Sequence, residues 1–90
     1  MKVLKFGAVW CSSCLVMLPR WEEIEKQHSW LKTEYFDIDK DKEIARKYNI
    51  KEGKLPTFVF LDKKGTEFLR KSGEISKEEL IKTILENKDK

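Results

Sequence analysis

The sequence predicts a single α/β domain, residues 1–90, in which a four-stranded mixed sheet carries helices on both faces. Short apolar runs alternate with stretches of helical periodicity, so strands and helices follow one another along the chain. The expected order is β-α-β-α-β-β-α. Two strand–helix units of this kind place their strands in parallel, and a closing hairpin adds antiparallel strands beside them.

The first two elements are a buried strand and a helix. Residues 2–9 are apolar on both faces, as in a strand that is covered on both sides. Residues 12 to about 27 predict a helix, in which Pro19 removes one backbone donor and should produce a kink. Apolar residues recur there at helical spacing: Leu15, Leu18, Trp21 and Ile24.

A second strand and a second helix follow. Residues 33–38 predict the strand, and either Asp39 or Asp41 can cap the helix after it. The buried face of this helix is expected to hold three residues, Ile44, Ala45 and Tyr48.

The third strand, residues 57–61, has the strongest strand pattern in the chain. A turn at residues 62–65 leads to its hairpin partner, residues 66–70, and Gly73 ends that strand. A last helix begins after a capping box formed by Ser76 and a glutamate three residues later. Its buried face is expected to comprise Leu80, Ile81, Ile84 and Leu85.

Composition narrows the classes of function. The chain is 40% hydrophobic, and its 19 basic and 16 acidic residues are interspersed and leave a net charge of +3. Without a basic stripe carrying aromatic residues, we expect no nucleic-acid partner. No apolar stretch approaches the roughly 20 residues of a membrane span, and Met1 leads directly into the first strand without a signal-peptide pattern. We therefore expect a cytoplasmic protein with no membrane partner.

The two cysteines, Cys11 and Cys14, stand three residues apart where a strand turns into a helix. At this spacing two thiols can close a small disulfide ring, or they can bind one soft metal ion. In a reducing compartment such a pair is catalytic or metal-binding more often than structural. The first helical turn favours an anion, so Cys11 is the expected nucleophile and the more buried Cys14 the resolving thiol.

The chain resembles the thioredoxin family over essentially all 90 residues, in a short form without the usual first strand and helix. The resemblance implies a minimal thioredoxin fold and a thiol–disulfide oxidoreductase that reduces disulfides in partner proteins. The residues that carry it are Trp10-Cys11-x-x-Cys14, Pro19, Asp39, Lys47-Tyr48, Leu55-Pro56-Thr57 and Gly73.

The resemblance also implies the parts of a substrate site. A cis Leu55–Pro56 bond would pack against the cysteines and expose the Leu55 backbone to an extended substrate, whereas the alternative is an ordinary trans proline. Trp10 would form one wall of the groove, unless it serves only for packing. The implied partners are disulfide-containing proteins and a reductase of the thioredoxin-reductase type, which uses a nicotinamide cofactor. We expect a monomer that holds no metal and no cofactor beyond the Cys11–Cys14 disulfide.

Four positions depart from the family pattern. Ser12 and Ser13 replace the common Gly-Pro between the cysteines, so the redox potential cannot be carried over. Lys5 replaces a buried aspartate, and Tyr35 aligns with the usual lysine partner of that aspartate. A cation under the motif would stabilise thiolates and make the pair more oxidising. A neutral Lys5 could act as base for Cys14, or its ammonium could turn outward to solvent.

Other functions remain as alternatives. A more oxidising disulfide donor and a glutaredoxin-like reductase belong to the same class, although no Thr-Val pair precedes Pro56 and no Gly-Gly glutathione site is present. A metal-binding module is a further alternative, but such domains place a methionine just ahead of the first cysteine, where this chain has Val9-Trp10. The intact cysteine pair argues against a binding domain that has lost turnover.

Overall fold

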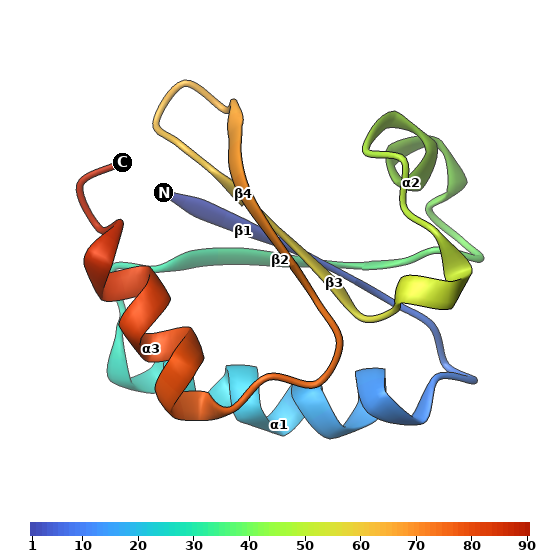
Figure 1. Cartoon of the computed structure of the whole chain (residues 1–90), viewed down its shortest axis with the longest axis horizontal. Helices are drawn as coiled ribbons and strands as arrows, with labels where there is room; N and C mark the ends of the chain where they lie inside the picture. The colour runs from blue at the N-terminus through green and yellow to red at the C-terminus, as the bar shows by residue number, and fades with distance from the viewer.

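The computed structural model describes residues 1–90 and contains one four-stranded mixed sheet (Figure 1). The strands lie in the order β2-β1-β3-β4, so β1 and β3 are central. β1 runs parallel to β2 and antiparallel to β3, which pairs antiparallel with β4. The predicted sheet is therefore confirmed, with the bounds β1 (Lys2–Gly7), β2 (Lys32–Asp37), β3 (Thr57–Leu61) and β4 (Glu67–Ser72).

Helices cover both faces of the sheet, as predicted. α1 (Ser12–Gln27) and α3 (Lys77–Glu86) lie together on one face, and the short α2 (Lys42–Lys47) lies on the other (Figure 1). A single 3-10 turn, η1 (Glu52–Lys54), leads into β3. None of the helices has the length and apolar character needed to cross a bilayer.

The apolar core is divided by the sheet into two clusters. The larger cluster lies under α1 and α3, where the Trp21 ring meets the Phe58 ring edge-on at 5.3 Å between centroids. The smaller one lies under α2 and includes Phe6, stacked on Phe36. Because β1 contributes side chains to both clusters, its position is fixed from both sides. The carboxyl end of β1, from which the chain continues to the cysteines, is thereby held in place.

The buried stripes of two helices differ from the predicted ones. In α1 the buried residues are Cys14, Met17, Trp21 and Ile24, whereas Leu15 is half-exposed. In α3 the prediction for Leu85 was wrong, because this side chain faces solvent and Thr83 is buried instead. Successive helical residues are rotated by about 100°, so the residue after a buried position readily falls outside the contact face.

The helix starts agree in part with the predictions. Ser76 is the N-cap of α3, and its hydroxyl accepts a hydrogen bond of 3.2 Å from the Glu79 backbone N–H. Asp41, rather than Asp39, is the N-cap of α2, and its carboxylate accepts from the Asp37 N–H instead of capping the helix. Asp39 does not cap the helix, and its carboxylate accepts a hydrogen bond from Trp10 instead.

Candidate active site

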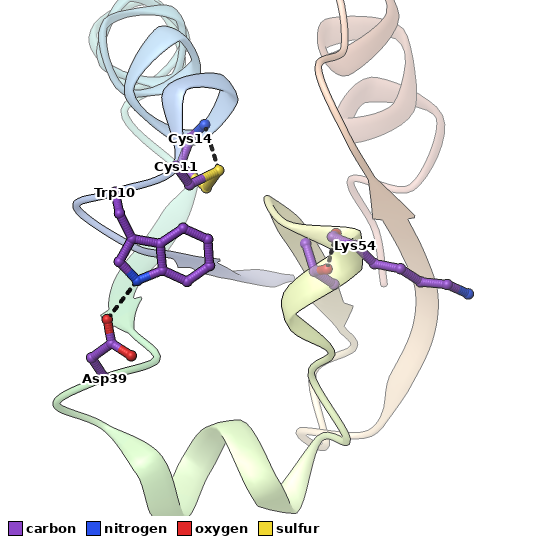
Figure 2. The surroundings of a disulfide bond; sticks show 6 residues. Trp10, Cys11, Cys14, Asp39 and Lys54 are labelled. Carbon is purple, nitrogen blue, oxygen red and sulfur yellow. Dashed lines mark hydrogen bonds between the residues drawn. A yellow bond between two sulfur atoms is a disulfide. The ribbon is translucent and has the colours of Figure 1, made fainter.

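Cys11 and Cys14 form a disulfide at the start of α1, with their Cα atoms 5.2 Å apart (Figure 2). Cys11 is the N-cap residue and is half-buried, whereas Cys14 lies in the first turn and is only 2% exposed. Cys14 is thus the more buried of the two cysteine residues, as predicted.

The local backbone explains why Cys11 can hold a negative charge. The Cys14 backbone N–H donates to the Cys11 Sγ at 3.2 Å, in the position that a capping oxygen would take. The first turn of α1 contains no acidic residue, so nothing there offsets the positive end of the helix dipole. Both features stabilise a thiolate at Cys11 relative to the thiol.

Trp10 lies beside the disulfide and is held by a side chain from another element. Its Nε1 donates to the Asp39 Oδ2 at 2.8 Å, and the indole ring lies next to the cysteines (Figure 2). Trp10 is 56% exposed, which is too much for a core residue. The structure therefore places a fixed, accessible aromatic surface at the site, and the expected cap residue Asp39 is what orients it.

Pro56 stands immediately before β3. The Leu55–Pro56 peptide bond is cis, and Pro56 is buried. The next residue, Thr57, pairs with Phe6 near the end of β1, the strand that leads to the cysteines. The loop before it is held by the Thr57 hydroxyl, which donates to the Lys54 carbonyl oxygen at 2.8 Å, while the Lys54 side chain points away from the disulfide (Figure 2).

Lys5 adopts none of the three arrangements expected from the sequence. It is buried, and its ammonium donates to the Glu25 Oε2 at 2.8 Å instead of turning outward to solvent. Glu25 lies on α1 eleven residues beyond Cys14, or about three helical turns away. Lys5 is thus an ion-paired core residue whose charge lies toward the far end of α1.

The side chain that lies near Cys14 is that of Tyr35, and not that of Lys5 as expected from the sequence. A Cβ atom added at Gly7 would lie 2.8 Å from the Tyr35 hydroxyl and 3.2 Å from the Cys14 Sγ. The two groups thus share the space that the missing side chain leaves. No role for Tyr35 was predicted from the sequence, although a glycine within a buried strand often marks a place where another group approaches the backbone closely.

Exposed apolar residues stand on both sides of the cysteine pair in the sequence. Only Trp10 among these residues was predicted from the sequence to contact substrate. Leu15 and Val16 of α1 turn outward because Cys14 and Met17 of the same helix turn inward. Of the two serines between the cysteines, Ser12 is exposed and Ser13 is half-buried. The exposed apolar residues around the site, called here the apolar rim, are Val9, Trp10, Leu15 and Val16.

The two hollows of greatest volume lie elsewhere on the surface. Two open hollows of about 400 Å³ and 420 Å³ lie beside α2 and are lined by neither cysteine. The cysteines do not belong to any group of three or more residues with metal-ligating side chains. The candidate site is therefore an open surface around a disulfide.

Comparison with known proteins gives a consistent result. Residues 1–86 match the family model described as Thioredoxin. The chain is 33% identical over 87 residues to a thioredoxin H-type of Brassica campestris, covering 94% of this chain and 66% of that protein. It is 38% identical over 86 residues to a thioredoxin of Rickettsia bellii, covering 94% and 79%. The chain thus spans slightly less than two thirds of the plant relative.

Solved structures agree in fold and in sequence. A thioredoxin of Fasciola hepatica superimposes with a TM-score of 0.85 at 34% identity, over 94% of this chain and 78% of that one. Thioredoxin-2, described as a component of the malaria parasite protein secretion machinery, gives 0.86 at 31% identity, over 94% and 81%. Because residues 1–86 of the 90 match the family model, this chain belongs to the thioredoxin family.

Proposed function

We propose that this protein is a thiol–disulfide oxidoreductase that reduces disulfide bonds in partner proteins. The observation that carries the proposal is the unequal pair of cysteines at the start of α1, one accessible and one buried, joined in a disulfide. A half-buried sulfur stabilised by the helix N-terminus is suited to attack, and a buried neighbour is suited to resolution.

The reaction has two exchange steps. In the first, the Cys11 thiolate attacks a substrate disulfide, forms a mixed disulfide and releases one substrate thiolate. In the second, the Cys14 thiolate attacks the Cys11 sulfur, which forms the Cys11–Cys14 bond and releases the second substrate thiolate. Two electrons pass from the protein to the substrate, and protons lost by the cysteines are balanced by those the released thiolates take up.

Protein substrates suit this site better than small molecules do. The apolar rim offers exposed hydrophobic contacts, and the hollows large enough for a small molecule lie away from the sulfurs. We propose that Trp10 and the Leu55 backbone before Pro56 bind an extended substrate segment beside Cys11. The disulfide itself is the redox group, so the cycle needs an external donor, for which a reductase of the thioredoxin-reductase type in the cytoplasm is proposed.

Substitution of each cysteine tests the proposal. Cys11→Ser should abolish reduction of a protein disulfide such as insulin, because no nucleophile remains at the surface. Cys14→Ser should form the mixed disulfide and fail to resolve it, so a trapped covalent complex should be visible on non-reducing gels. Turnover by the Cys11→Ser variant, or trapping by Cys11→Ser instead of Cys14→Ser, would contradict the assigned roles.

A further inference from the structure

Gly7, Tyr35 and Cys14 come from three different elements and meet behind the disulfide. The Tyr35 hydroxyl and the Cys14 Sγ lie 2.8 Å and 3.2 Å from the same point, the position of the Cβ that Gly7 lacks. Tyr35 belongs to the edge strand β2, while Gly7 ends β1, the strand beside it. A side chain at position 7 would collide with both groups, so the glycine keeps the space between the hydroxyl and the sulfur open. In the disulfide form no hydrogen bond joins the two groups.

From this geometry we infer that the Tyr35 hydroxyl is a hydrogen-bond donor to the Cys14 thiolate. The inference rests on the proposed function, in which Cys14 must lose its proton before it attacks the mixed disulfide. A disulfide sulfur is a poor acceptor, whereas a thiolate is a strong one, so the bond forms when the Cys11–Cys14 bond has opened. The donor stabilises the anion, and the proton that Cys14 loses passes to solvent.

The charged groups around Tyr35 keep its hydroxyl protonated. Tyr35 is 38% exposed, and its partial burial, followed by the carboxylate of Asp37 on the same strand, raises the pKa of Tyr35 above its ordinary value. On the neighbouring strand its register partner is Lys5, whose ammonium is already bound to Glu25 of α1. Asp39, beyond the end of β2, is engaged by the Trp10 indole. Tyr35 therefore donates a hydrogen bond at neutral pH and does not act as a base.

The predicted kinetic effect of Tyr35→Phe has an opposite sign at low and at high pH. Loss of one hydrogen bond to a thiolate should raise the pH midpoint of the resolution step by about one pH unit. Below the midpoint, the variant has a smaller fraction of Cys14 as thiolate. Each thiolate is more nucleophilic, however, because nucleophilicity rises with the pKa of the thiol with a Brønsted coefficient of about 0.4–0.5. Resolution should thus be about threefold slower below both midpoints and about threefold faster above them.

Stopped-flow mixing of the reduced protein with 5,5′-dithiobis(2-nitrobenzoate) measures both steps. A first release of coloured thiolate reports attack by Cys11, and a second release reports resolution by Cys14. Tyr35→Phe should leave the first phase unchanged and shift the pH profile of the second. Tyr48→Phe is the matched control, because this ring packs near Phe6 on the other face of the sheet.

The two phases keep the two proposals separate. Absence of a second, intramolecular release in the unaltered protein would overturn the proposed function. A biphasic release in which Tyr35→Phe and Tyr48→Phe have the same pH profile would overturn the role of Tyr35 alone. A loss of rate by the same factor at every pH would also overturn it, because that pattern indicates a merely structural effect. Tyr35→Phe keeps the aromatic ring, so the fold is retained, and circular dichroism checks this.

Discussion

Lys5 and Glu25 form an ion pair whose contribution to the free energy of unfolding depends on how deeply the two side chains are buried. The Lys5 side chain is 11% exposed and that of Glu25 is 31% exposed. Thr33 also donates to the carboxylate oxygen that Lys5 binds, at 2.9 Å, and the ammonium lies 5.8 Å from the centre of the Trp21 ring. The pair is therefore part of a small polar network in the core. Removing one partner leaves the other charge without compensation in a poorly solvated place.

We predict that Glu25→Gln lowers the free energy of unfolding by about 2 kcal/mol, less than for a fully buried pair because Glu25 is partly solvated. The matched control is Glu34→Gln, which breaks the exposed Lys2–Glu34 pair of the same 2.8 Å length and should cost less than about 1 kcal/mol. Urea denaturation of both variants measures the difference. Equal losses would mean that burial does not decide the strength of these pairs.

At the scale of elements, the end of β4 depends on a glycine. Gly73 has a φ of +90°, a conformation that side chains with a Cβ rarely adopt, and its N–H donates to the Pro56 carbonyl oxygen at 2.8 Å. Gly53 in η1 has no positive φ. A Cβ added at either position would meet no atom within 4 Å. The two glycines thus differ in backbone conformation and not in available space.

Alanine substitutions at Gly73 and Gly53 together measure the free-energy cost of placing a side chain in the left-handed backbone conformation. Gly73→Ala should destabilise the protein by about 1–2 kcal/mol. Gly53→Ala should leave stability unchanged or raise it by up to about 1 kcal/mol, because alanine restricts the unfolded chain. Thermal unfolding of the two variants at one pH measures the contrast. Similar losses in both would contradict the assignment of strain to Gly73.

Elements defined by local patterns were the predictable part of this fold. The Ser76 cap, the β3 run and the start of α1 depend on residues close together in sequence, and each was found near its predicted place. The prediction that Leu85 is buried was wrong because helical periodicity locates the centre of the apolar stripe but not which residues at its border are buried. That edge is set by how α3 packs on the rest of the fold, which the local pattern does not contain.

At the scale of the whole molecule, the candidate site is assembled from separate strands and a helix. Cys11 and Cys14 could be identified from their spacing, but the partners of Lys5 and Tyr35 could not. Glu25 meets Lys5 across 20 residues of sequence, and the space used by Tyr35 exists only because β1 carries Gly7 beside it. Such contacts follow from strand order and register, which local periodicity does not specify.

The redox potential of the Cys11–Cys14 pair depends on all the groups that stabilise its thiolates. We predict a potential between about −270 mV, the value of thioredoxin, and about −200 mV. Two observed features favour a Cys11 thiolate and hence the reduced form, namely the helix N-terminus and the Cys14 N–H at the Cys11 sulfur. The proposed hydrogen bond from the Tyr35 hydroxyl would add to them at Cys14. Because Lys5 is neutralised by Glu25, its charge contributes little. Equilibration with defined thiol–disulfide buffers gives the potential, and Tyr35→Phe should make it more negative. A value at or below −270 mV would contradict thiolate stabilisation as the determinant, whereas one well above −200 mV would make the protein a disulfide donor.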